Sequence, residues 1–75
     1  MEIYEKVRLY IHDNGLVQYK IADKAGFSKA TFSAILNGKR TMYADDLRAI
    51  CIALNVKPEL FIDYDHRQGI DPNQK

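Results

Sequence analysis

Residues 18–37 constrain the fold most, because two short helical patterns and a tight turn fit within this one stretch. The helical segments cover residues 17–25 and 28–36, and Gly26 between them can adopt the left-handed backbone that a sharp turn needs. The positions expected to face inward are small or apolar: Ile21, Ala22, Ala25, Phe27, Phe32 and Ile35. The spacing predicts two helices joined by a tight turn, with the outer face of the second helix free of core packing.

Helical spacing also recurs on both sides of this pair. Residues 2–13 read as an amphipathic helix that ends at Asn14-Gly15, residues 43–54 as a fourth helix, and Pro58 can sit in the first turn of a short fifth helix that buries Leu60 and Phe61. The expected apolar stripes are Ile3, Tyr4, Val7, Tyr10 and Ile11 in the first helix, and Ala44, Leu47, Ile50, Cys51 and Leu54 in the fourth.

The predicted fold class is therefore all-α, a compact bundle of four to five helices around a central helix-turn-helix. A chain of 75 residues makes one domain. We expect residues 1–62 to form it and residues 63–75, which are polar and contain Gly69 and Pro72, to be a flexible tail.

The charge of the chain is unevenly distributed. The net charge is only +1, but residues 1–40 carry seven basic and four acidic side chains, and residues 41–75 carry four basic and six acidic ones. The first part is thus +3 and the second −2, and the positive part holds the predicted helix pair. A small domain can acquire such an asymmetry by chance, so it supports nucleic-acid binding only together with the pattern.

Several classes of protein are disfavoured. A single cysteine excludes an internal disulfide, and the longest apolar run, Ala49 to Leu54, is too short to span a bilayer. Glu2 and Glu5 do not fit the basic start of a signal peptide, so we expect a cytoplasmic protein. The cysteine and the two histidines are far apart and do not suggest a zinc site. We expect no cofactor, no metal and no enzyme activity.

Residues 17–61 resemble the helix-turn-helix domain of the lambdoid phage repressors and Cro proteins, which are XRE-like transcriptional regulators. The resemblance rests on one continuous register: Gln18, Ile21-Ala22, Ala25-Gly26-Phe27, Ser28, Phe32, Ile35, Asn37-Gly38-Lys39, Leu47, Ile50, Leu54, Val56 and Leu60-Phe61. It implies a helical bundle that binds operator DNA as a dimer.

The chain departs from the family at three places. Val17 stands where a capping Thr or Ser is usual, and Met42-Tyr43 replace the Pro and small hydroxyl residue that often begin the fourth helix. Ile11 and Leu36 occupy the positions of an Arg–Glu pair found in several members. Because both partners are apolar, we expect a hydrophobic contact in place of the ion pair.

The resemblance and the free outer face together point to a recognition helix that begins at Ser28 and enters the DNA major groove. The residues expected to read bases are Ser28, Lys29, Ala30, Ser33 and Ala34. Lys29 can donate to guanine, whereas the alanines can only pack on thymine methyl groups. The alternative for Lys29 is a solvated surface lysine.

A second set of residues is expected to contact DNA phosphates: Gln18, Asn37, Lys39, Arg40, Thr41 and Tyr43. Gln18 begins a helix, where free N–H groups attract phosphate, but it can also be a surface residue without a role. Asn37 can equally serve the end of the recognition helix. Lys20 and Lys24 provide long-range electrostatic support or are simply solvated.

The sequence thus predicts a repressor-like regulator of phage or mobile-element type that binds a palindromic operator as a homodimer. Tyr43, the outer side of the fourth helix and residues 60–64 are candidate dimer surfaces. The main alternative is a protein-interaction module, such as an antitoxin or a protein bound by an antirepressor. A nuclease is a weaker alternative, because no carboxylate or metal cluster lies near the basic residues.

Overall fold

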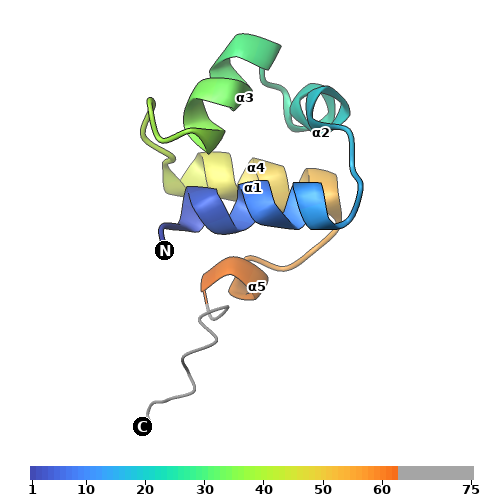
Figure 1. Ribbon diagram of the computed structural model, residues 1–75, viewed down its shortest axis with the longest axis vertical. Coiled ribbons are helices and arrows are strands. Elements are labelled where there is room, and N and C mark those ends of the chain that lie inside the picture. Colours follow the sequence, from blue (N-terminus) through green and yellow to red (C-terminus); the bar gives the residue numbers. More distant parts are fainter. Residues whose placement is uncertain (63–75) are drawn as a thin grey trace, which may run out of the picture.

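The fold is all-helical. The computed structural model of the protein describes residues 1–62, and the predicted tail lies outside these residues. Within residues 1–62, five helices follow one another: α1 (Ile3–Asp13), α2 (Gln18–Ala25), α3 (Lys29–Leu36), α4 (Ala44–Leu54) and α5 (Glu59–Ile62) (Figure 1). The predicted fold class is confirmed, and the predicted helix boundaries agree to within about one residue.

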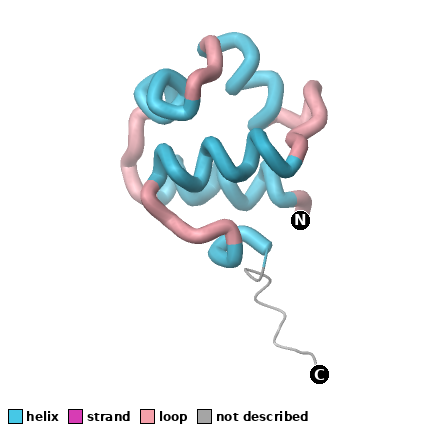
Figure 2. Tube along the Cα trace, turned by 180° about the vertical axis from the view of Figure 1, so that it is seen from behind, coloured by secondary structure: helices cyan, strands magenta, loops and turns pink. Residues whose placement is uncertain are grey.

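The helices form three layers around a shared hydrophobic core. In both views α1 and α4 lie one behind the other, with α2 and α3 on one side of them and α5 on the other (Figures 1 and 2). The core combines buried side chains from all five helices: Val7, Ile11, Ile21, Ala22, Phe32, Leu36, Ile50, Cys51 and Phe61. Helix α3, the predicted recognition helix, and the short helix α5 therefore lie at opposite ends of the described part of the molecule.

The inward face of the helix pair is as the spacing predicted. Phe32 and Ile35 are fully buried, and Ala22 is 1% exposed where α2 lies against its neighbours. The Phe27 and Phe32 rings stack with their centroids 5.8 Å apart. Each large apolar side chain buried in this way contributes about 1.5–3 kcal/mol. This packing fixes α3 without using its outer face.

Two expectations about burial were wrong in part. Ala44 is exposed because it is the first residue of α4 and lies beyond the helices that cover the rest of the stripe. Leu60 is only half-buried, whereas its neighbour Phe61 is 1% exposed and packs edge-on against Tyr10. The short α5 therefore inserts one aromatic ring into the core and leaves its other apolar side chains at the surface.

The starts of α2, α3 and α4 are stabilised in different ways. Ser28 caps α3, since its hydroxyl accepts a hydrogen bond of 3.1 Å from the Thr31 N–H. Val17 provides no side-chain cap for α2. At the start of α4, the Asp46 carboxylate accepts a hydrogen bond of 3.0 Å from the Tyr43 N–H, so an acid in the first turn satisfies the N–H of the residue that precedes the helix.

Candidate nucleic-acid interface

The outer face of α3 is accessible as predicted. Of its five predicted base-reading residues, Ser28, Lys29 and Ala30 are exposed, and Ser33 and Ala34 are half-buried. The exposed ones lie at the N-terminal end of α3, the end that a helix-turn-helix inserts into the major groove. No described segment of the chain packs over this end, because α1, α4 and α5 all lie on the inner side of the pair (Figure 1).

Lys29 does not extend freely into solvent. Its ammonium lies over the ring of Tyr19, 5.0 Å from the ring centroid. Tyr19 is the second residue of α2 and is 52% exposed. The two residues line one side of a shallow hollow between the helices, together with Lys20, Asp23, Lys24, Phe27 and Ser28. The position of the Lys29 side chain is thus set partly by α2.

A hydrogen-bond network joins the end of α3 to α1. The Arg8 guanidinium donates to the Leu36 carbonyl (3.0 Å) and to Oδ1 of Asn37 (3.1 Å). Asn37 in turn donates from Nδ2 to the Ser33 carbonyl (2.8 Å) and to the Ser33 hydroxyl (3.3 Å). The side chain of Asn37 therefore stabilises the end of α3, which was one of its two predicted roles. Asn37 is nevertheless exposed, next to the loop that contains Lys39 and Arg40.

Where several members of the family have an ion pair between their first and third helices, this chain has an apolar contact and, beside it, hydrogen bonds from Arg8. Ile11 and Leu36 are buried in the same hydrophobic cluster, as expected. Arg8, which lies on α1 almost one turn before Ile11, supplies the polar link to α3 instead. A cation at this place also suits the negative end of the α3 dipole.

The loop between α3 and α4 carries most of the predicted phosphate-contact residues. Lys39, Arg40, Thr41 and Tyr43 are all exposed, and so is Gln18 at the start of α2. The loop folds back on α1: a Cβ built on Gly38 would lie 2.5 Å from the Tyr4 hydroxyl oxygen. Gly38 also has a left-handed backbone, with φ +74°. The contact of Tyr4 with Gly38 therefore helps to position Lys39 and Arg40, whose backbone N–H groups also donate to the Ala34 carbonyl of α3.

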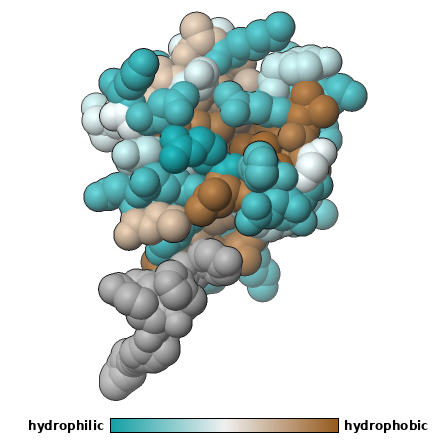
Figure 3. Space-filling view, in the orientation of Figure 1, coloured by the Kyte–Doolittle hydropathy of each residue, from teal (hydrophilic) through white to brown (hydrophobic). Residues whose placement is uncertain are grey.

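The electrostatics favour an anionic partner on this side. Residues 18–44 contain five basic side chains and only one acidic one, Asp23. Within residues 1–62, only His12 and Asp13, both on α1, lie within ion-pair distance of each other. The basic side chains of α2, α3 and the loop therefore keep their charge available. Hydrophilic side chains cover much of the face shown in Figure 3, and hydrophobic ones reach the surface mainly toward its middle and right edge.

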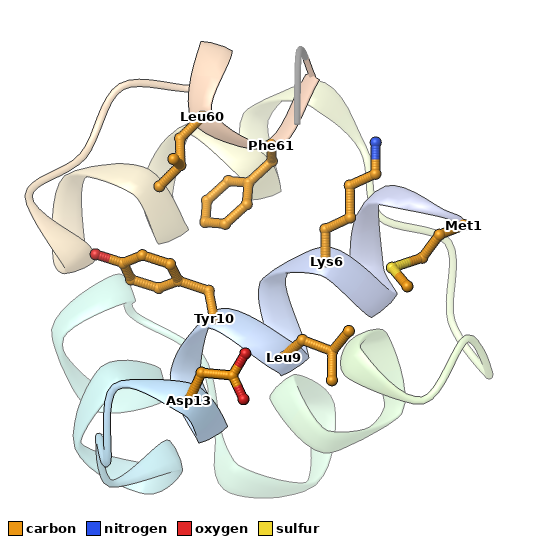
Figure 4. Close-up of a pocket in the computed structure, with 7 residues that line it drawn as sticks. All are labelled: Met1, Lys6, Leu9, Tyr10, Asp13, Leu60 and Phe61. Atoms are coloured by element: carbon orange, nitrogen blue, oxygen red, sulfur yellow. The ribbon is translucent and has the colours of Figure 1, made fainter. Parts of the chain in front are cut away.

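A second, apolar hollow lies on the other side of α1, between α1 and α5. It measures about 380 Å³ and is lined by Met1, Lys6, Leu9, Tyr10, Asp13, Leu60 and Phe61 (Figure 4). Lys6 is buried, and its stem runs beside Phe61 with the ammonium at the outer end (Figure 4). Leu9 is 40% exposed and Ile62 of α5 is 55% exposed.

The sequence did not predict the roles of three residues that contact the candidate interface: Tyr4, Arg8 and Tyr19. Tyr4 was assigned to the core stripe of its helix, and Arg8 and Tyr19 were given no role. The apolar residues at the family's Arg–Glu positions were a signal that a different polar group links α1 to the end of α3. No signal in the sequence paired Tyr19 with Lys29, because the contact depends on how α2 and α3 cross.

The comparisons with known proteins agree with this geometry. Residues 6–66 match the family model of the Cro/C1-type HTH DNA-binding domain. Searches of the curated proteins and of the solved structures gave no significant match. No helix within residues 1–62 is long and apolar enough to cross a membrane. The matched segment contains α2, α3 and the loop with all the predicted contact residues, and the chain therefore belongs to the family of Cro/C1-type helix-turn-helix DNA-binding domains.

Proposed function

We propose that the protein is a sequence-specific, repressor-like regulator that reads the major groove of double-stranded DNA with α3. The observation that carries this proposal is the exposed N-terminal face of α3, flanked by basic side chains that have no ion-pair partner among the described residues. Because the chain resembles bacterial and phage regulators, we expect it to act on DNA in the bacterial cytoplasm. The family membership supports DNA binding, and the geometry of this face supports the mode of reading.

The base-reading face offers few hydrogen bonds. Lys29 can donate to O6 and N7 of a guanine, and Ala30 and Ala34 can pack on thymine methyl groups. One good polar base contact discriminates by about 1–3 kcal/mol. The rest of the sequence preference would then come from DNA shape and from a second subunit.

The exposed residues around α3 would hold the DNA backbone. Gln18 lies where α2 presents N–H groups that no side chain caps, which suits a phosphate oxygen. Lys39 and Arg40 would reach the adjacent strand from the loop, with Thr41 and Tyr43 beside them. These contacts fix the register of the protein on the duplex but carry no base information.

We also propose that the protein acts as a homodimer. A single small domain reads few base pairs, whereas a twofold dimer reads two half-sites roughly 10 base pairs apart. Tyr43, Ile52 and Ile62 are large apolar residues that are 63%, 69% and 55% exposed, and they lie on the surfaces predicted to pair. Sedimentation at micromolar concentration, with and without DNA, tests this. A monomer in both states would contradict it.

The function is tested by selecting duplexes that the purified protein retains from a random-sequence pool. We expect a short inverted repeat to be enriched, because a symmetric dimer presents two copies of α3. Enrichment of one half-site would support base reading but not the dimer. Failure to retain any duplex in low-salt buffer would overturn the proposal.

A second function is favoured by the hollow between α1 and α5. Its apolar lining and the exposed Leu9 and Ile62 would suit a protein partner, such as a toxin or an antirepressor, on the side away from α3. Leu9→Asp should then abolish capture of that partner while DNA binding is unchanged. Equal loss of both activities would instead indicate misfolding.

A further inference from the structure

We infer that Tyr19 is a positioning residue for base recognition. Its ring holds the Lys29 ammonium on the side of α3 that faces the DNA major groove, and this increases the preference for the base that Lys29 contacts. The inference deepens the proposed function and rests on it. Tyr19 acts through Lys29.

The contact has the geometry of a cation–π interaction. The Lys29 Nζ lies 5.0 Å from the Tyr19 ring centroid, within the range of roughly 6 Å in which a ring attracts an ammonium. Both residues are largely exposed, and no ion pair with another described residue is recorded for Lys29. Within residues 1–62, the Lys29 ammonium therefore interacts with the Tyr19 ring and forms no ion pair.

The contact leaves Lys29 able to read a base. An ammonium carries three N–H donors, so one side can rest on the ring while the others point toward guanine O6 and N7. A free lysine side chain is flexible and loses rotamer entropy when it binds. The ring restricts that freedom before DNA arrives, because the Tyr19 backbone is held in α2 two residues from the buried Ile21.

The experiment uses a duplex recovered by selection with the unmodified chain, together with its single-base variants. Tyr19→Leu removes the ring but keeps a bulky apolar side chain, and Tyr19→Phe keeps the ring. We expect Tyr19→Leu to reduce discrimination at one base pair by about two- to fivefold, the range that an exposed cation–π contact supports. Tyr19→Phe should retain the discrimination.

A double-mutant cycle identifies the residue through which Tyr19 acts. In a Lys29→Ala background, Tyr19→Leu should no longer change the base preference. Lys24 lines the same hollow and is the matched control, so in a Lys24→Ala background the effect of Tyr19→Leu should persist in full. An effect of Tyr19→Leu that is equal on all duplexes and persists in the Lys29→Ala background would overturn the inference.

A second readout needs no DNA. The ring should shift the NMR signals of the Lys29 side-chain methylene protons upfield, and the shift should vanish in Tyr19→Leu and survive in Tyr19→Phe. Absence of the shift in the unmodified chain would overturn the inference even if the protein binds an operator. Its presence in a chain that ignores every duplex would instead locate the failure in the proposed function.

Discussion

At the scale of single residues, the proposed interface contains side chains that would contact base edges and side chains that would contact phosphates. Lys29 at the start of α3 is the charged side chain among the predicted base-reading residues. Arg40 lies on the loop after α3 and is exposed. Because base edges carry sequence information and phosphates do not, substitutions of these two residues should have different signatures.

Lys29→Ala should weaken binding and reduce discrimination at one base pair by about 1–3 kcal/mol. Arg40→Ala is the matched comparison: it should weaken binding similarly on every duplex and lower the slope of log affinity against log salt by about 1. Titrations of both variants on the selected duplex and its single-base variants, at several salt concentrations, measure this. An equal loss on all sequences for Lys29→Ala would refute its base-reading role.

At the scale of elements, α1 determines how the end of α3 and the following loop are held. Arg8 provides the hydrogen bonds to the end of α3, and Tyr4 packs against Gly38. The loop that carries Lys39 and Arg40 has no regular secondary structure of its own between α3 and α4. Its position therefore depends on these contacts with α1 and on the backbone hydrogen bonds from Lys39 and Arg40 to the Ala34 carbonyl of α3. Helix α1 itself offers no residue to the predicted DNA contacts.

Arg8→Ala should destabilise the fold by about 1.5–3 kcal/mol, because hydrogen bonds from a charged group are lost and the Leu36 carbonyl is left without this donor. Arg8→Lys should restore only part of the loss, since a lysine lacks the planar fork of donors. Urea unfolding measures the change, and Arg48→Ala on the exposed part of α4 is the control. A loss no larger than that of the control would contradict the bridging role.

Gly38→Ala should destabilise the protein more than Gly26→Ala. Both glycines have positive φ, +74° and +87°, so an alanine at either position incurs a backbone cost of about 1–2 kcal/mol. At Gly38 the new Cβ would also displace Tyr4, whereas nothing lies within 4 Å of a Cβ at Gly26. Thermal unfolding compares the two, and equal losses would show that Tyr4 moves aside freely.

At the scale of the whole molecule, the core has no covalent cross-link and depends on packing. Cys51 is 2% exposed in the middle of α4, where it acts as a small hydrophobic residue. Burial raises the pKa of the Cys51 thiol, and the Glu59 carboxylate raises it further. The thiol thus stays protonated in the folded chain at a pH where the unfolded chain ionises.

We expect Cys51 to react with iodoacetamide much more slowly in the folded chain than in guanidinium at the same pH, because the thiolate is the reactive form. The same pKa shift also affects the stability of the fold. Since the pKa of the Cys51 thiol is higher in the folded chain, the free energy of unfolding is unaffected below the thiol's ordinary pKa and falls as pH rises above it. Mass spectrometry of timed samples at pH 8 measures the rates. Equal rates in both states would show that α4 opens readily.

Part of this architecture follows from the sequence alone. The helical spacing, the turn at Gly26 and the Ser28 cap depend on residues close together in the chain, and all three were predicted. The buried Phe32 and Ile35 followed as well, because helical spacing assigns side chains to faces. The base-reading set could be named only through the family resemblance, and its role remains a proposal.

The tertiary structure decided which residues support that face. The contacts of Arg8 with Asn37, Tyr4 with Gly38 and Tyr19 with Lys29 each join two helices or a helix and a loop, at separations of 10 to 34 residues. Sequence periodicity shows which way a side chain points from its own helix, but not which helix lies opposite. That is set by the packing of the shared core, so these partners become visible only when the bundle is assembled.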